Sequence, residues 1–283
     1  MEKRRLGKTK QMVSVLTFGS AALWNISQGE ADEAIGKYVG LGVNYFDVSP
    51  EYGQAEVRLG PWIEKHHKEI FLASKTTERS KVRAWESLKR SLDTLRVDGC
   101  NLFQFHGVQD IETLNAVLSP KGALEMALEA KQQGLVQYIG ITGHRPFVLI
   151  EALNHFDFDT VLFPLNRVLA AHRDDYNDFT ALVELASQKD VGIIIIKAIT
   201  KQPWQVALRM YKTWYEPFDQ QEDIDKSVWY ALSQDITTYA MASDLRLWPM
   251  IVDAAERFKP LDVQEQETVV REVRRYRPLF SSV

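Results

Sequence analysis

Four polar residues with acid–base chemistry lie at or just after the ends of apolar runs in the first half of the chain. Asp47, Lys75 and His106 each close a short apolar run, and Tyr52 follows Asp47 in the next loop. If the three runs are neighbouring parallel strands, their carboxyl ends meet at one edge and bring all four side chains around one volume. Such a grouping indicates a proton-transfer site.

The chemistry of this cluster depends on control of the tyrosine pKa. A free phenol has a pKa of about 10 and is a weak proton donor or acceptor at neutral pH. A neighbouring Lys75 ammonium lowers that pKa, and Asp47 keeps the ammonium charged and oriented. His106, as a neutral imidazole, hydrogen-bonds a substrate oxygen and directs it toward Tyr52. These are the requirements of carbonyl reduction, and since none of the four residues supplies hydride, a cofactor must do so.

Each of the four residues also has a structural explanation when it is considered alone. Asp47 would cap the following helix, and Tyr52 would be a half-buried packing ring. Lys75 would be solvated, and His106 would be a hydrogen-bonded core histidine. The functional interpretation is preferred because the four occur together, at three consecutive strand ends.

The chain alternates β-rich runs with amphipathic helical patterns, which is the order expected of parallel strands joined by helices. The eight β-like runs cover residues 13–19, 43–48, 70–75, 102–106, 137–142, 160–165, 191–197 and 235–241. Helical patterns lie between most of them and again at 263–280, while the stretch 198–234 is longer and less regular.

Eight such units predict a closed (β/α)8 TIM barrel, a fold of roughly 250 residues. A short β-hairpin around Gly7 and Lys8 precedes the barrel, and a C-terminal helix follows it. A doubly wound open sheet gives a similar alternation, but the glycines at 40 and 42 precede a β-like run, whereas a dinucleotide fingerprint follows one. We therefore expect one barrel domain over residues 1–283.

Composition and charge argue against several functional classes. The net charge is −4 without a long basic stretch, so a small molecule is the expected partner and nucleic acid is not. Cys100 is the single cysteine, and the pair His66 and His67 lacks a spaced third ligand, so no metal is expected. No signal region or membrane span is recognisable, which predicts a cytoplasmic protein. The oligomeric state stays open.

The motifs around the four polar residues resemble those of the aldo-keto reductase family. The matching segments are GVNYFDVSPEYG with AE at 55–56, then FLASKT, LFQFHGV and GLVQYIGITGH. The resemblance covers at least residues 3–200 in order and spacing, and by implication the whole barrel. It implies that Asp47, Tyr52, Lys75 and His106 form a catalytic tetrad with Tyr52 as the general acid. It also implies a carbonyl substrate and NADPH as the hydride source, with NADH as the alternative donor.

The cofactor contacts implied by the resemblance match less well, because the sequence departs from the family pattern. Where the family often has a Ser-Asn pair for the nicotinamide carboxamide, this chain has Thr142, Gly143 and His144. Thr142 keeps a hydroxyl, and His144 is either a substitute contact or an exposed loop residue. Asn166 is either a cofactor contact or a turn residue. Lys197 either faces the cofactor phosphates or extends its ammonium outward.

The segment after the eighth run differs most from the family. Members commonly carry a Ser/Lys/Arg cluster that holds the adenosine 2′-phosphate of NADPH. Here Ser243 and Arg246 are the only candidates, and Asp244 would repel a phosphate. Trp24, after the first run, is either an aromatic wall of the substrate pocket or a packing residue.

Two functions are consistent with these residues. The first is NAD(P)H-dependent reduction of an aldehyde or ketone to an alcohol, or the reverse reaction. The second is a nicotinamide-nucleotide-binding regulatory or redox-sensing barrel with negligible turnover. The two differ in one assay, because Tyr52→Phe abolishes carbonyl-dependent NADPH oxidation only in an enzyme.

Overall fold

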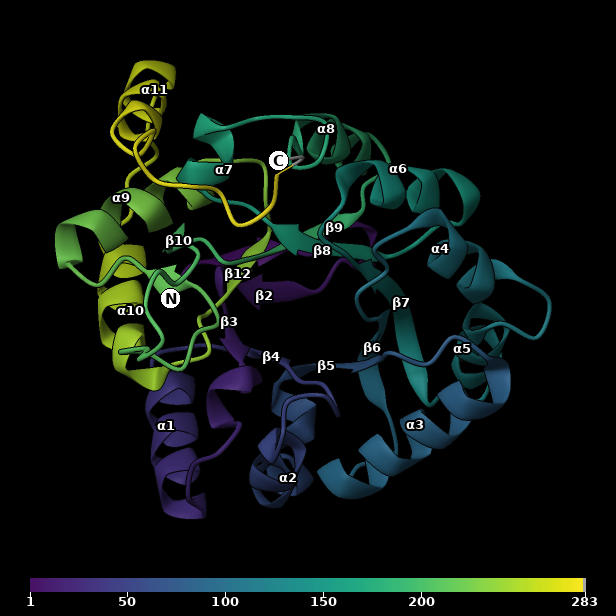
Figure 1. Ribbon diagram of the computed structural model, residues 1–283. Coiled ribbons are helices and arrows are strands. Elements are labelled where there is room, and N and C mark those ends of the chain that lie inside the picture. Colours follow the sequence, from purple (N-terminus) through teal and green to yellow (C-terminus); the bar gives the residue numbers. More distant parts are fainter. Residues whose placement is uncertain (282–283) are drawn as a thin grey trace.

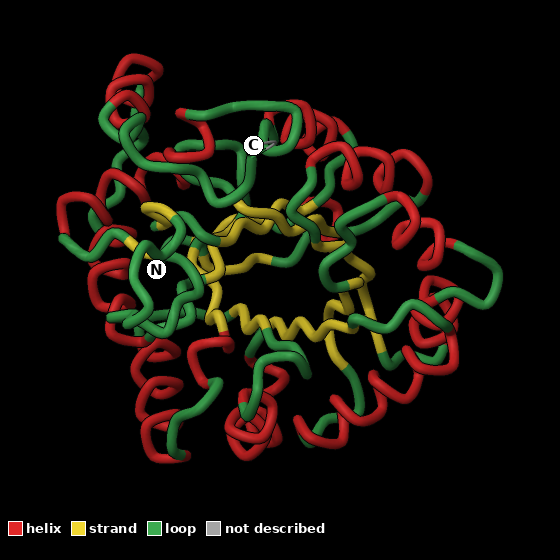
Figure 2. The backbone as a smooth tube through the Cα atoms, viewed as in Figure 1, coloured by secondary structure: helices red, strands yellow, loops and turns green. Residues whose placement is uncertain are grey.

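Eight parallel strands close into a barrel that is surrounded by helices (Figures 1 and 2), as the sequence predicts. The computed structural model describes residues 1–281. In spatial order the barrel strands are β12 (Thr238–Ala240), β3 (Leu16–Gly19), β4 (Tyr45–Asp47), β5 (Phe71–Thr76), β6 (Cys100–Phe105), β7 (Val136–Thr142), β8 (Thr160–Pro164) and β9 (Gly192–Ile196). The strands are buried on both faces, which explains why runs such as Gly192–Ile196 lack polar alternation.

A hairpin closes one end of the barrel. Strands β1 (Lys3–Arg5) and β2 (Met12–Ser14) pair antiparallel, which confirms the hairpin predicted around Gly7 and Lys8. Leu6 and Val13 pack into a cluster inside the barrel with Tyr45 and Phe71. The predicted run 13–19 is therefore two strands, the second leg of the hairpin and β3. Because the hairpin fills this end, the opposite, carboxyl end of the strands is the one left for a site.

Helices surround the barrel, and the last of them packs on two other helices. They are α1 (Gln28–Gly40), α2 (Ala55–His66), α3 (Lys81–Leu95), α4 (Ile111–Leu118), α5 (Ala123–Gln132), α6 (Pro146–His155), α7 (Arg167–Ala171), α8 (Thr180–Gln188), α9 (Gln221–Leu232), α10 (Trp248–Glu256) and α11 (Val263–Arg271). Within residues 1–281, none of them is both long and apolar enough to cross a membrane.

Two expectations about the C-terminal third are corrected. The stretch 198–234 contains a regular helix, α9, after a small sheet of β10 (Thr200–Gln202) and β11 (Glu216–Pro217). The last helix ends at Arg271 instead of continuing to residue 280. The chain after α11 turns back toward the barrel mouth, where Phe280 stacks on His144.

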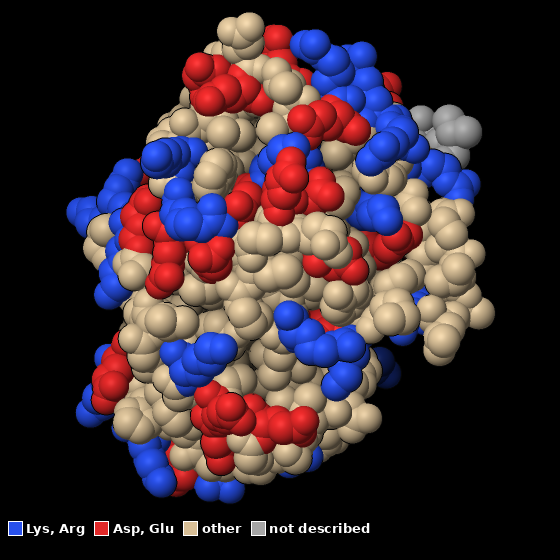
Figure 3. All heavy atoms as spheres, turned by 90° about the vertical axis from the view of Figure 1, so that its left-hand side faces the viewer, with Lys and Arg blue, Asp and Glu red and all other residues tan. Residues whose placement is uncertain are grey.

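Acidic and basic side chains are interspersed on the face that carries α9, α10 and α11 (Figure 3). Arg257 pairs with Asp225 across α9 and α10, and Lys226 lies 3.0 Å from the Glu272 carboxylate. These contacts agree with a solvated, salt-bridged surface around the C-terminal helix.

Candidate active site

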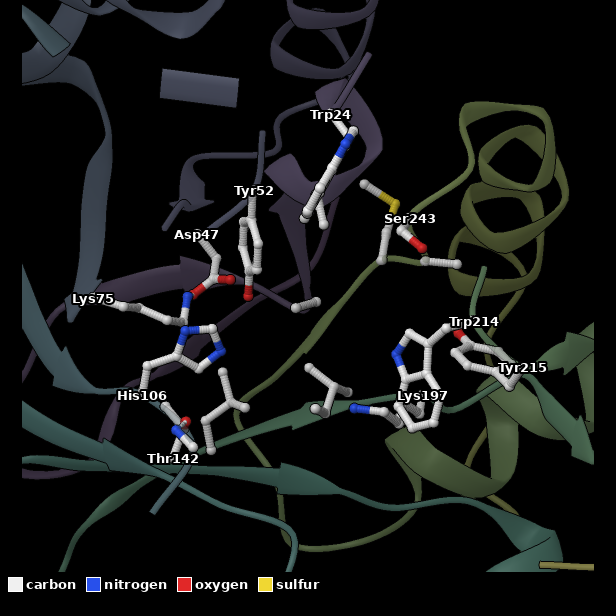
Figure 4. A pocket seen from close by; sticks show the side chains of 18 of the residues that line it. Trp24, Asp47, Tyr52, Lys75, His106, Thr142, Lys197, Trp214, Tyr215 and Ser243 are labelled. Carbon is white, nitrogen blue, oxygen red and sulfur yellow. Dashed lines mark hydrogen bonds and ion pairs between the residues drawn. The ribbon is translucent and has the colours of Figure 1, made fainter. Parts of the chain in front are cut away.

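A cavity of about 780 Å³ opens at the carboxyl ends of the barrel strands (Figure 4). Of the residues predicted from the sequence, Trp24, Asp47, Tyr52, Lys75, His106, Thr142, His144, Lys197 and Ser243 line it. Asn166 and Arg246 do not. The phenol of Tyr52, the carboxylate of Asp47, the ammonium of Lys75 and the imidazole of His106 point toward one another.

Asp47 and Lys75 form a buried ion pair. The last residue of β4 and the fifth of β5 meet on adjacent strands, with Asp47 and Lys75 almost fully inaccessible to solvent. The Lys75 ammonium also donates to the Val48 carbonyl at 3.3 Å. Burial raises the pKa of Asp47 and lowers the pKa of Lys75, and each partner opposes the shift of the other. The pair therefore stays charged only because both members are present.

Tyr52 lies against this pair, but its pKa is not lowered as the sequence predicts. The Lys75 ammonium lies 5.3 Å from the centroid of the Tyr52 ring. Burial, and then the nearby Asp47 carboxylate, raise the pKa of Tyr52 well above that of a free phenol. The reason is that Asp47 offsets the ammonium charge while desolvation penalises the phenolate. Tyr52 is thus a protonated donor across the neutral pH range.

His106 is held in place by its backbone and by Ser49. Its backbone N–H donates to the Thr76 carbonyl at 2.8 Å, and Arg79 donates to its carbonyl at 2.6 Å. The imidazole Nδ1 lies 3.2 Å from the Ser49 hydroxyl. Burial, followed by the positive charges of Lys75, Lys197 and Arg79, lowers the pKa of His106 to about 3. The imidazole is therefore neutral near pH 7, which is the state that the sequence predicts.

His144 and Lys197 meet on the side of the cavity opposite Asp47. Their Nε2 and Nζ atoms lie 3.0 Å apart, and Gln109 contacts His144 Nδ1 at 2.9 Å. Trp214 and Phe280 cover the pair, and the Phe280 ring stacks on His144 with centroids 4.7 Å apart. His144 is therefore part of the cavity wall, which excludes the exposed-loop interpretation. Lys197 faces the cavity and does not extend outward.

Sequence reasoning missed Gln109, Trp214 and Phe280. Gln109 had a usable signal, since it is a polar residue in the loop after the strand that ends at His106. Trp214 and Phe280 had none, because they approach the cavity from distant parts of the chain.

Two predicted cofactor contacts, Asn166 and Arg246, have side chains that form hydrogen bonds to other groups of the protein. Asn166 caps α7, accepting from the Leu169 N–H at 2.8 Å, and donates to the Lys197 carbonyl at 3.2 Å. This arrangement favours the turn-forming alternative. Arg246 donates to both carboxylate oxygens of Asp244, at 3.0 and 2.7 Å, and also to the Met210 carbonyl. Its charge is therefore largely compensated.

Thr142, Ser243 and Trp24 lie where the sequence predicts, on the cavity wall. The Thr142 hydroxyl accepts from the Gly107 N–H at 2.8 Å, which ties the loop after β6 to the end of β7. Trp24 is half-exposed at the rim, and a Cβ on Gly53, whose φ is +56°, would approach the Trp24 carbonyl to 2.7 Å. Glycine at position 53 thus lets this loop pack against Trp24.

Within residues 1–281, no group of three or more histidine, cysteine, aspartate or glutamate side chains is arranged to hold a metal ion. Cys100 is buried in β6, and burial raises the pKa of its thiol to about 12.

The chain matches known proteins along most of its length. The sequence model of the Aldo/keto reductase family matches residues 15–243. The uncharacterized oxidoreductase YqkF of Bacillus subtilis (strain 168) is 29% identical over 165 residues, which are 53% of this chain and 52% of that protein. L-galactose dehydrogenase of Arabidopsis thaliana is 26% identical over 213 residues, 70% of this chain and 65% of that protein. The matches thus span about half and just under two thirds of these relatives.

Solved structures show the same fold. The holo form of the aldo-keto reductase AKR11C1 from Bacillus halodurans superimposes with a TM-score of 0.72 at 23% identity, and the match covers 96% of each chain. The family match extends from the first barrel strand to just beyond the last. The chain belongs to the aldo/keto reductase family, whose members are oxidoreductases that use nicotinamide cofactors.

Proposed function

We propose that this protein is an NADPH-dependent oxidoreductase that reduces an aldehyde or ketone to an alcohol, or catalyses the reverse reaction, with Tyr52 as the general acid. The observation that carries the proposal is the convergence of Asp47, Tyr52, Lys75 and His106 in one cavity. The test is carbonyl-dependent consumption of NADPH, measured with a panel of aliphatic and aromatic aldehydes and ketones. The proposal fails if no member of the panel is reduced.

The cavity fits a nicotinamide nucleotide in both its chemistry and its position. It contains a lysine, Lys197, that has no carboxylate partner within residues 1–281, and a diphosphate would compensate the charge that this lysine carries when it is protonated. Thr142, His144 and Ser243 lie on the same wall and would contribute polar contacts. A bound nicotinamide nucleotide supplies the hydride. We propose that these residues hold it beside the tetrad.

The residues of the tetrad have separate tasks in this proposal. The neutral His106 donates a hydrogen bond to the carbonyl oxygen and thereby positions it. Tyr52 transfers its phenolic proton to that oxygen as negative charge develops there. Lys75 stabilises the resulting phenolate, and Asp47 keeps Lys75 protonated although it is buried.

The two reaction directions are expected to differ in their pH dependence. With saturating NADPH and substrate, the kcat of reduction stays flat between about pH 5 and about pH 8, because Tyr52 remains protonated and His106 neutral. The kcat of alcohol oxidation rises about tenfold per pH unit there, since it requires the phenolate as base. Steady-state kinetics in both directions measure this. A flat oxidation profile with rate-limiting chemistry, established from a substrate deuterium isotope effect, contradicts the assignment of Tyr52.

Selectivity for NADPH over NADH is expected to depend on Asp244. In the proposed complex, Ser243 and Arg246 contact the 2′-phosphate, while the Asp244 carboxylate opposes it and occupies Arg246. Asp244→Asn removes the like charge and keeps a side chain that caps the following turn. Its NADPH preference, expressed as a ratio of Kd values, is expected to rise by about tenfold, corresponding to about 1.4 kcal/mol.

The ratio of Kd values cancels any general effect of the Asp244 substitution on folding. Asp235→Asn is the matched control, since Asp235 bonds Ser187 at the other end of the barrel. An equal ratio in the two variants places the 2′-phosphate away from Asp244.

A further inference from the structure

The side chains of Gln109, His144 and Lys197 form a hydrogen-bonded chain that reaches the cavity through His144 and Lys197, opposite Asp47. Gln109 contacts the loop after β7 twice, through Nε2 at 2.9 Å from His144 Nδ1 and through Oε1 at 2.9 Å from the His144 backbone N–H. On the other side of the imidazole, Nε2 lies 3.0 Å from the Lys197 Nζ. None of these three residues belongs to the tetrad.

The hydrogen bond from the His144 backbone N–H to Gln109 fixes which atoms of these three side chains are hydrogen-bond donors. A backbone N–H only donates, so the Gln109 atom facing it is the carbonyl oxygen, and the amide nitrogen faces His144 Nδ1. Since an amide nitrogen also only donates, Nδ1 is the unprotonated nitrogen of the ring. A neutral imidazole then carries its proton on Nε2, the atom that faces Lys197.

An Nε2–H donor facing Nζ requires a lysine that accepts. A charged ammonium has three protons and no lone pair, so it cannot accept a hydrogen bond from Nε2–H. A neutral amine has the lone pair. Only the combination of neutral His144 and neutral Lys197 leaves every contact in the chain with one donor and one acceptor.

The burial of Lys197 agrees with this state. The residue is buried, and within residues 1–281 no carboxylate forms an ion pair with it. The backbone of Lys197 has a φ of +65°. Residues other than glycine adopt this conformation at a cost in conformational energy, and such residues are concentrated at functional sites. The other titratable or charged groups that line the cavity are Asp47, Tyr52, Lys75, His106, Lys212 and Tyr215.

We propose that Gln109, His144 and Lys197 form a proton-linked anion site, in which Lys197 is a neutral amine when the cavity is free and takes up a proton when an anionic group enters. The site rests on the proposed function only for the identity of the anion. That anion is the diphosphate of a nicotinamide nucleotide or a carboxylate of the carbonyl substrate, which share the charged oxygen that a lysine ammonium binds.

Desolvation lowers the pKa of Lys197 to about 7, and a bound anion raises it again. Above about pH 7, each bound anion therefore brings one proton with it. The affinity consequently falls about tenfold per pH unit until the pKa of the complex is reached. His144, whose pKa burial and the nearby cations lower to about 2, stays neutral over this range and contributes no proton.

Proton uptake is measured by isothermal titration calorimetry of the full-length protein with NADPH at about pH 8. The observed enthalpy is compared in buffers of different ionisation enthalpy, and the slope gives the number of protons bound. The 2′-phosphate has a second pKa of about 6 and is already dianionic at this pH. We expect about one proton per NADPH for the wild-type protein and about none for Lys197→Arg, which keeps a permanent charge.

Gln109→Glu tests the role of the hydrogen-bonded chain while retaining Lys197. A carboxylate accepts from both the backbone N–H and an Nδ1–H, so it moves the ring proton to Nδ1 and leaves the Nε2 lone pair for a charged Lys197. We expect this variant to bind NADPH with uptake of about no proton. Lys201→Met is the matched control, because Lys201 is ion-paired with Glu216 nearby, and its uptake stays near one proton.

A second titration uses benzoate, a carboxylate that does not titrate at about pH 8. Uptake with NADPH identifies the nucleotide as the source of the anion, and uptake with benzoate alone identifies a substrate carboxylate. Binding of both probes without uptake by the wild-type protein overturns the proposal, as does uptake of about one proton by Gln109→Glu. If benzoate binds with uptake but NADPH does not bind, the nicotinamide-dependent function fails and the anion site stands.

Discussion

Tyr52→Phe is expected to lower the rate of carbonyl reduction by about 10²- to 10⁴-fold and to leave the Kd for NADPH unchanged. The substitution removes the only proton that the proposed chemistry takes from this side chain and keeps the ring. The centroid of the Tyr52 ring lies 5.8 Å from that of the His106 ring and 5.3 Å from the Lys75 ammonium. A phenylalanine ring keeps this packing. The decrease should appear in kcat more than in KM, since the proton is transferred in the transition state.

The matched control for Tyr52→Phe is Tyr138→Phe. Tyr138 is a barrel tyrosine whose hydroxyl donates to the Thr9 carbonyl beside the N-terminal hairpin, at the other end of the barrel. It should retain wild-type turnover. If Tyr52→Phe reduces carbonyls as fast as the wild-type protein, another group supplies the proton. If the wild-type protein binds NADPH but turns over no carbonyl in the panel, the regulatory barrel becomes the better explanation.

The barrel could be predicted because its signals are local and repeated. Runs such as the four isoleucines before Lys197 identify strands that are buried on both faces, and helical periodicity marks most of the segments between them. Helix α9 was missed because it follows the irregular segment that contains β10 and β11, although Glu222 and Asp223 in its first turn are a helix-start signal. The early end of α11 could not be anticipated from Pro278, because a proline restricts only the residue before it and Pro278 lies well beyond Arg271.

The convergence of the four polar residues could be predicted because the carboxyl ends of parallel barrel strands meet at one mouth. Which of the predicted cofactor contacts line the cavity could be predicted only in part, since Thr142, His144, Lys197 and Ser243 line it and Asn166 and Arg246 do not. Whether Asn166 and Arg246 face a ligand or bond to the protein depends on the positions of Leu169 and Asp244 in three dimensions. The pKa of Tyr52 was misjudged for the same reason, since the balance between burial and the Asp47–Lys75 pair is set by packing.

The second large expected effect concerns stability, which depends on the ion pair between Asp47 and Lys75. Lys75→Met leaves the Asp47 carboxylate buried without its counterion and is expected to cost about 3–5 kcal/mol in the free energy of unfolding. The double variant Asp47→Leu and Lys75→Met replaces both charges with apolar groups and should recover most of that loss. Neither variant is expected to reduce carbonyls, so the recovery separates folding from catalysis. Urea unfolding monitored by circular dichroism gives the free energy of unfolding of the wild-type protein, Lys75→Met and the double variant.

The pH dependence of Lys75→Met provides an independent check. Burial already raises the pKa of Asp47 in the wild-type protein, and loss of Lys75 removes the interaction that opposes this shift. The folded variant therefore binds a proton more tightly than the unfolded chain, and its stability falls as the pH rises through the interval between the two pKa values. Relative to the double variant, which has no carboxylate at position 47, Lys75→Met should be closest in stability at acidic pH and furthest from it at neutral pH. A constant difference between the two would mean that Asp47 finds another partner when Lys75 is absent, and the tetrad would then not depend on this ion pair.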